Sequence, residues 1–132
     1  MRPGLGFGQH HFHLADTIDW AAAHAAVDLL SGKWTIPVIA ALLAGPRRHG
    51  DLRRAVNPRM SDKVLTQTLR RMEATELVTR HAVEGNPPMV SYQLSTLGRS
   101  LTGPLTALAR WHSTHRPHAT MREERTPGSQ SG

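Results

Sequence analysis

The 132-residue sequence contains no cysteine and few aromatic residues, with three tryptophans, one tyrosine and two phenylalanines. The absence of cysteine excludes disulfides, thiolate catalysis and cysteine-ligated zinc or iron–sulfur sites. No apolar run approaches the roughly 18 residues that a membrane-spanning helix needs. Glycine and proline interrupt residues 1–8, where a signal peptide would carry its apolar segment. We therefore expect a cytoplasmic protein that associates with the nucleoid and not with a membrane.

Lysine is also scarce, since 14 of the 16 basic residues are arginine, and the formal net charge is +6. Such a charge favours a polyanionic partner, most often nucleic acid, with a membrane surface as the second choice. A GC-rich genome, which uses arginine and alanine freely, would give the same composition whatever the function. The length suits one domain with a true core.

Composition divides the chain into a folded centre and two tails. Residues 1–14 are rich in Gly and His without hydrophobic periodicity, and we expect a flexible arm there. Residues 116–132 include Pro117 and Pro127 and are expected to be a disordered tail. The folded domain is therefore placed at 15–115.

Two helices are expected at the start of this domain. Apolar residues at helical spacing predict the first over 17–31, with Asp16 or Thr17 as its N-cap. The segment 34–43 is apolar nearly all round, which is typical of a helix at the centre of a domain. Pro37 fits this second helix only in its first turn, where a missing N–H costs nothing.

The next two helices form a pair joined by a tight turn. A short amphipathic helix is expected at 49–56, and Asn57 and Pro58 make the turn. Ser61 then caps a helix over 61–71, because its hydroxyl can accept from a free backbone N–H of the first turn. This helix is expected to bury a narrow apolar edge and to present a basic, polar face.

After this pair the hydrophobic period changes from 3.6 to 2. Strands are expected at 77–79 and 90–94, joined by the turn-forming residues 84–88, and Ser95 caps a final helix over 96–113. Two helices joined by a tight turn and followed by a hairpin are the plan of a winged helix-turn-helix. The expected fold class is therefore mainly α with a small β-hairpin wing.

Five segments stand out together over about residues 21–112: 27–34 (VDLLSGKW), 45–54 (GPRRHGDLRR), 61–70 (SDKVLTQTLR), 77–80 (LVTR) and 87–98 (PPMVSYQLSTLG). In order and spacing they resemble motifs of the HxlR-type family of bacterial regulators, relatives of the MarR group. The resemblance implies a homodimeric transcription factor that binds two-fold operators in double-stranded DNA and dimerises through its first and last helices. Repression is favoured over activation in such families.

Three positions depart from the family pattern. Ala21 stands where many members carry a sensor cysteine, so thiol sensing is not expected. His49 replaces a phenylalanine, and Met89 replaces a basic residue in the hairpin. The last change is expected to weaken a contact of the hairpin with phosphate or the minor groove.

The candidate DNA-binding residues lie on the second helix of the pair, in the basic cluster before it and in the hairpin: Ser61, Lys63, Thr66, Gln67, Arg70, Arg71, Arg47, Arg48, Arg53, Arg54, Arg80 and Asn86. Gln67 can bond adenine and Arg70 can bond guanine in a bidentate way, or either can bind phosphate. Arg71 lies to the side and better suits a phosphate. Arg53 and Arg54 contact either the DNA backbone or acidic residues, with Asp51, Glu73 and Glu76 as the candidates, and a merely solvated basic face is the plain alternative.

The candidate dimer interface consists of apolar residues of the first and last helices: Ile18, Ala22, Leu97, Leu101, Leu105, Leu108 and Trp111. The leucine row of the last helix would otherwise pack inside its own subunit. An effector would be a small molecule or a partner protein, since no thiol is present. A pocket near Trp20, Trp34 and Trp111 is one candidate site, although core or interface packing accounts better for these tryptophans.

Other function classes have weaker support. An RNA-binding winged helix is the main alternative, but few aromatic residues are available to stack on single-stranded RNA. His10, His11 and His13 suggest metal binding, yet no acidic or cysteine partner lies nearby in the sequence. No paired acid–base groups, phosphate loop or Ser/His/Asp arrangement indicates an enzyme. We therefore expect no cofactor, no metal site and no catalysis.

Overall fold

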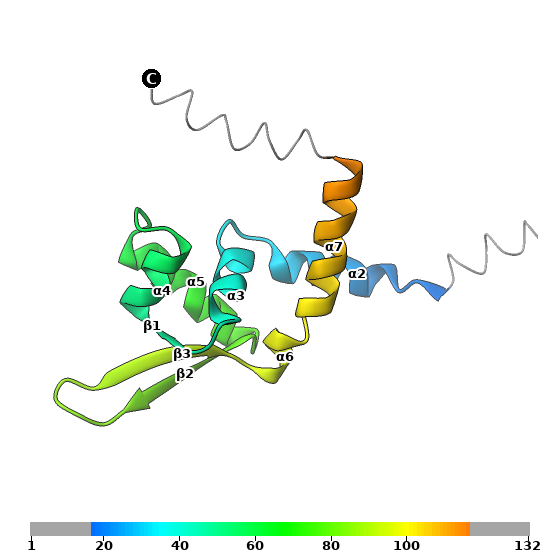
Figure 1. Cartoon of the computed structure of the whole chain (residues 1–132). Coiled ribbons are helices and arrows are strands. Elements are labelled where there is room, and N and C mark those ends of the chain that lie inside the picture. The colour runs from blue at the N-terminus through cyan, green and yellow to red at the C-terminus, as the bar shows by residue number, and fades with distance from the viewer. Residues whose placement is uncertain (1–16, 117–132) are drawn as a thin grey trace, which may run out of the picture.

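The computed structural model of the protein describes residues 17–116, which form a helical body with a three-stranded antiparallel sheet (Figure 1). The expected arm at 1–14 and all but the first residue of the expected tail at 116–132 lie outside this range. The element order is α2 (Trp20–Leu30), α3 (Thr35–Leu42), β1 (Arg47–Arg48), α4 (His49–Val56), α5 (Asp62–Ala74), β2 (Val78–Val83), β3 (Met89–Leu94), α6 (Thr96–Arg99) and α7 (Thr102–His115). The predicted fold class is confirmed.

Helices α3, α4 and α5 pack with the sheet around one hydrophobic core. Its buried members are Val38, Ile39, Leu42, Leu52, Met60, Leu65, Leu69, Met72, Leu77, Val78, Tyr92 and Leu94. Burying each large apolar side chain contributes about 1.5–3 kcal/mol relative to leaving it exposed. α3 is central as predicted, and Pro37 occupies its first turn, where no helical hydrogen bond is lost.

α4 and α5 form the predicted helix-turn-helix. α4 has the predicted bounds, and Ser61 caps α5 as predicted, since its Oγ accepts from the backbone N–H of Val64 at 3.1 Å. In the turn, the backbone N–H of Arg59 donates to Asn57 Oδ1 at 2.9 Å. α5 continues to Ala74, beyond the predicted end at residue 71.

The hairpin is longer than predicted and belongs to a larger sheet. β2 and β3 pair from Val78 opposite Leu94 to Val83 opposite Met89. β1, which the sequence pattern does not predict, pairs with β3 and makes the strand order β1-β3-β2. Two residues are too few to show the alternation of a strand, so only the tertiary pairing identifies β1.

The predicted cap of the first helix is wrong. The N-cap of α2 is Asp19, whose Oδ1 accepts from the backbone N–H of Ala22 at 2.9 Å, and not Asp16 or Thr17. Within residues 17–116, no single helix is long and apolar enough to cross a bilayer. α2 and α3 reach that length and composition only as a pair, with a bend of 77° between them.

The predicted final helix over 96–113 is also wrong as a single element, because it is divided into α6 and α7. Ser95 caps α6 as expected, accepting from the backbone N–H of Gly98 at 2.9 Å. The chain then bends at Leu101, and Pro104 lies in the first turn of α7. In one continuous helix, the ring of Pro104 would clash with the carbonyl of Ser100 and one hydrogen bond would be lost. The break places the proline where it is tolerated.

Candidate nucleic-acid interface

Three polar side chains on the outer face of α5 form the first part of the candidate site. Lys63, Gln67 and Arg70 are exposed, whereas Leu65 and Leu69 on the opposite side are buried. In the described part of the chain, none of these three side chains forms a side-chain hydrogen bond or ion pair. Spacings of four and three residues align them on one face of the helix. Their donors and acceptors are therefore available to an external partner.

Two other predicted residues of α5 form hydrogen bonds with neighbouring helices of the same chain. Thr66 is half-buried, and its Oγ1 lies 3.0 Å from Nε2 of His49 on α4. The guanidinium of Arg71 donates to Oγ1 of Thr35 at 3.4 Å, on α3. A helical wheel cannot show these contacts, because they depend on how α3 and α4 pack against α5.

Arg53 holds the turn of the helix-turn-helix. Its Nη1 donates to the backbone carbonyl of Pro58 at 2.6 Å, and its Nε lies 3.3 Å from Oδ1 of Asp62. The side chain thus bridges the end of α4 and the start of α5. The acidic partner of Arg53 is thus Asp62 and not Asp51, Glu73 or Glu76, the partners expected from the sequence.

The remaining arginines of the basic cluster have different surroundings. Nε of Arg47 donates to the backbone carbonyl of Ala41 at 2.8 Å, which ties β1 to α3. Arg54 pairs with Asp51 at 2.6 Å on the surface. Arg48 remains exposed and has no acidic partner within residues 17–116.

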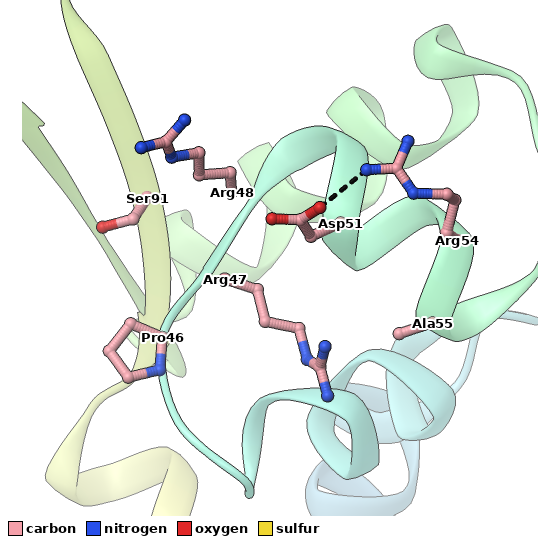
Figure 2. Close-up of a pocket in the computed structure, with 7 residues that line it drawn as sticks. All are labelled: Pro46, Arg47, Arg48, Asp51, Arg54, Ala55 and Ser91. Atoms are coloured by element: carbon pink, nitrogen blue, oxygen red, sulfur yellow. Dashed lines mark hydrogen bonds and ion pairs between the residues drawn. The ribbon is translucent and has the colours of Figure 1, made fainter.

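Between α4 and the sheet lies an open cleft of about 660 Å³ (Figure 2). Its lining residues are Pro46, Arg47, Arg48, Asp51, Arg54, Ala55 and Ser91. Figure 2 shows Arg54 paired with Asp51, while the side chain of Arg47 extends away from Arg48 toward a neighbouring helix. Three arginines and one aspartate give the cleft an excess of positive charge, which suits a phosphate oxygen.

Ser91 belongs to this cleft although the sequence did not single it out as a site residue. The alternation of β3 places Ser91 on the face opposite Tyr92 and Leu94, which is the available signal. Its pairing with Arg48 of β1 then brings it beside the basic cluster. The sequence could not show this placement, because β1 is not recognisable from its two residues.

The end of the hairpin combines polar and apolar side chains. Arg80 and Asn86, the predicted wing residues, are exposed. Val83 and Met89 pair across the strands and are 64% and 46% exposed. Arg48 lies against this end, with Nη2 at 3.6 Å from Sδ of Met89. A guanidinium from β1 therefore stands beside the position at which the wing lacks its expected basic residue.

A separate surface of α2 and α7 is apolar. Figure 1 shows both helices at the end of the molecule away from the hairpin tip, and neither contains a buried residue. Of the predicted interface residues, five are exposed: Ile18, Ala22, Leu97, Leu108 and Trp111. Leu101 and Leu105 are half-buried and pack against the core of their own chain.

Beside this surface, α3 and α7 border a mainly apolar hollow of about 450 Å³. It is lined by Ile36, Leu105, Leu108, Ala109, His112 and Ser113. Trp20, Trp34 and Trp111, named above as a candidate effector site, do not line this hollow. Trp34 packs against the core, and Trp111 stacks on His115.

Metal binding gains no support from the part of the chain that the structure describes. Within residues 17–116, no group of three His, Asp or Glu side chains is placed to hold a metal ion. His10, His11 and His13 lie outside these residues.

Comparison with known proteins agrees with this geometry. The HxlR-like helix-turn-helix family profile matches residues 29–120. The HTH-type transcriptional regulator YtcD of Bacillus subtilis (strain 168) is 36% identical over 94 residues, which cover 71% of this chain and 74% of YtcD.

A crystal structure of a MarR-family transcriptional regulator from Enterococcus faecalis V583 has a TM-score of 0.69 at 31% identity, over 83% of this chain and 94% of that one. The reduced form of the transcriptional regulator YodB from B. subtilis has a TM-score of 0.66 at 27% identity, over 70% and 90% of the two chains. The protein belongs to the HxlR-like helix-turn-helix family and is a DNA-binding transcriptional regulator with a MarR-like winged-helix fold.

Proposed function

We propose that the protein acts as a homodimer on a two-fold operator, with one α5 helix in each of two successive major grooves. The observation that carries this proposal is the unpartnered face of α5 formed by Lys63, Gln67 and Arg70. In helix-turn-helix proteins the second helix reads the major groove, and half-sites lie about 34–36 Å apart. Gln67 then reads adenine and Arg70 reads guanine, each through a bidentate pair.

Backbone phosphates are assigned to residues around this face. Arg48 and Arg54 reach phosphate from the cleft beside α4, and the start of α5 at Ser61 offers its backbone N–H groups. Arg80 and Asn86 contact the backbone along the wing. Each phosphate neutralised makes the logarithm of affinity fall with the logarithm of salt concentration by about 0.9.

The exposed apolar surface of α2 and α7 supports dimerisation. Trp20 is 63%, Leu108 54% and Trp111 52% exposed in the single chain. Contiguous exposed apolar surface of this kind marks an interaction site. A second copy would cover these side chains in the proposed dimer. Leu101 and Leu105 would then support the interface from within their own subunit.

The protein would act in the cytoplasm. Repression is the favoured outcome, because a dimer that covers an operator excludes other proteins from the same DNA. The chain contains no cysteine, so its response would not use a thiol of its own. A small molecule or partner protein could act only by binding two states of the dimer unequally. The hollow between α3 and α7 is the place proposed for a small apolar effector.

The test is the selection of duplexes from a random DNA pool by the purified chain. Footprinting and sedimentation of the resulting complex then follow. We expect a protected two-fold site with half-site centres about one helical turn apart and a mass of two chains per duplex. A folded protein that enriches no sequence would contradict operator binding. A mass of one chain at micromolar concentration would contradict the dimer.

A further inference from the structure

We infer that Arg71 does not contact DNA but holds α5 at a fixed angle to α2, and so determines which half-site spacing the dimer accepts. The inference rests on the proposed homodimer and two-fold operator. It makes Arg71 a positioning residue that acts through its neighbours.

Two successive hydrogen bonds connect the last turn of α5 to the end of α2. Nη2 of Arg71 donates to Oγ1 of Thr35 at 3.4 Å, and Oγ1 of Thr35 donates to the backbone carbonyl of Ser31 at 3.0 Å. Thr35 is the first residue of α3, and Ser31 is the C-cap of α2. Because a hydroxyl has one proton and two lone pairs, Thr35 can satisfy both partners at once. Three helices therefore meet at one side chain.

Gly32 makes room for the guanidinium at this junction. A Cβ at Gly32 would lie 2.5 Å from Nη2 of Arg71 and 3.0 Å from Oγ1 of Thr35. Gly32 also has a φ of +104°, a conformation that glycine adopts without strain. The backbone at this position therefore favours glycine, and any Cβ there would displace the guanidinium of Arg71 from its present place. The guanidinium also lies beside the negative end of the α2 dipole, which favours a cation there.

Burial of the central hydroxyl strengthens the connection. Thr35 is 1% exposed, so water has little access to compete for its Oγ1. Arg71 is an exposed residue overall. Its positioning role is inferred from the direction of its guanidinium, which points toward Gly32 and Thr35. Arg70 is the adjacent residue, and successive helical residues point about 100° apart. One arginine therefore faces outward while the next faces the α2–α3 junction.

This junction links the two proposed working surfaces of the protein. α2 lies in the proposed dimer interface, and α5 is the proposed reading helix. The angle between them therefore sets the separation of the two α5 helices in the dimer. One base pair of spacer changes the half-site separation by about 3.4 Å and the rotation by about 35°. A rigid junction accepts one spacing, whereas a loosened junction accepts several.

The experiment measures binding of the full chain to a duplex selected by the wild-type protein. Two further duplexes have one base pair inserted or removed between the half-sites. We expect the wild type to lose about tenfold or more in affinity on the altered duplexes, because the DNA must twist to restore both contacts. Arg71→Ala and Thr35→Val should bind the selected duplex more weakly and discriminate among the three by less than about threefold.

Two controls accompany these variants. Arg99→Ala removes one exposed arginine at the end of α6 and should keep the wild-type spacing preference. Thr35→Ser keeps the hydroxyl and should keep the preference as well. A cooperative thermal transition shows that each variant is folded, and Arg71→Ala carries the test alone if Thr35→Val does not fold.

Salt dependence separates positioning from phosphate binding. A positioning role leaves the salt slope of Arg71→Ala equal to that of the wild type, whereas loss of one phosphate contact in each subunit lowers the slope of the dimer by about 1.8. A lowered slope with the spacing preference intact would overturn the inference, as would an unchanged preference in Arg71→Ala. Failure of the proposed function looks different, since the wild type itself would bind as one chain per duplex.

Discussion

Arg70 and Arg71 are adjacent in α5 but have different surroundings. Arg70 is exposed and has no side-chain partner among the described residues, whereas Arg71 donates to Thr35 at the α2–α3 junction. Arg53 likewise serves the turn of the helix-turn-helix, although it lies in the same basic cluster as the exposed Arg48. At this scale, the partner of each guanidinium decides its role, and charge alone does not.

Arg70→Ala should abolish specific DNA binding while the protein remains a dimer. Each bidentate base contact is worth about 1–3 kcal/mol, and the dimer loses two of them, which removes most of the roughly 4–10 kcal/mol that separates specific from non-specific binding. Mobility shifts on the selected and on a scrambled duplex measure the effect, and sedimentation measures the mass. Arg99→Ala, which removes an exposed arginine from α6, is the matched control. Equal protection of the selected site by Arg70→Ala would show that the assigned groove face is wrong.

Ser95→Ala should lower the free energy of unfolding by about 1–2 kcal/mol, because Ser95 is an N-cap. Its Oγ accepts from the backbone N–H of Gly98 at 2.9 Å and donates to the carbonyl of Glu76 at 2.6 Å. Urea unfolding measures the change. Ser113→Ala, an exposed serine within α7, should change stability by less than about 0.5 kcal/mol. An equal effect of both substitutions would argue against the capping role.

At the scale of elements, α5 and the hairpin differ in how they are anchored to the core. α5 presents a continuous polar face, and its opposite stripe is anchored in the core by Leu65, Leu69 and Met72. The hairpin has no such anchoring at its end, where Val83 and Met89 are exposed. Its positive charge comes partly from Arg48 of the neighbouring strand β1. Element by element, the helix suits base reading and the wing suits backbone contact.

Met89→Arg should strengthen DNA binding and steepen its salt dependence by up to about 1.8 in slope for the dimer, because it adds one cation to each of the two wings. The affinity is measured on the selected duplex over a range of salt concentrations. Thr96→Arg, which adds the same charge on exposed α6, is the control and should leave the slope unchanged. Equal slopes for Met89→Arg and the wild type would indicate that the wing does not approach phosphate.

At the scale of the whole molecule, the polar and apolar surfaces lie apart. The wing tip lies at one end of the body, and α2 and α7 lie toward the other (Figure 1). In the proposed dimer, the apolar end would form the interface and both α5 faces would stay open to DNA. The two α5 helices would also be coupled, since each is joined to α2 through Thr35.

Leu108→Asp should convert the dimer into monomers at micromolar concentration, because a carboxylate buried in an apolar interface lacks a partner. Sedimentation gives the mass, and circular dichroism checks that the helices persist. Val83→Asp is the matched control, since Val83 is also exposed but lies at the wing tip. It should remain a dimer. A dimeric Leu108→Asp variant would exclude this surface of α7 from the interface.

The sequence by itself determined the fold class and the position of α5, the helix proposed to read DNA. The signals were local: the capping Ser61, the stripe of Leu65 and Leu69, and the change of hydrophobic period before the hairpin. Each depends on neighbours in the chain, so periodicity and capping chemistry reveal them. Lys63, Gln67 and Arg70 followed from the same helical register.

The tertiary structure alone decided which of the basic residues are engaged internally. It paired β1 with β3 and joined Arg71 to Thr35, a residue 36 positions earlier. Such contacts join residues far apart in sequence and depend on packing geometry, which no local pattern records. The sequence thus identified the charged surface. The fold distinguished the exposed side chains that lack a partner among the described residues from those that hydrogen-bond to neighbouring helices.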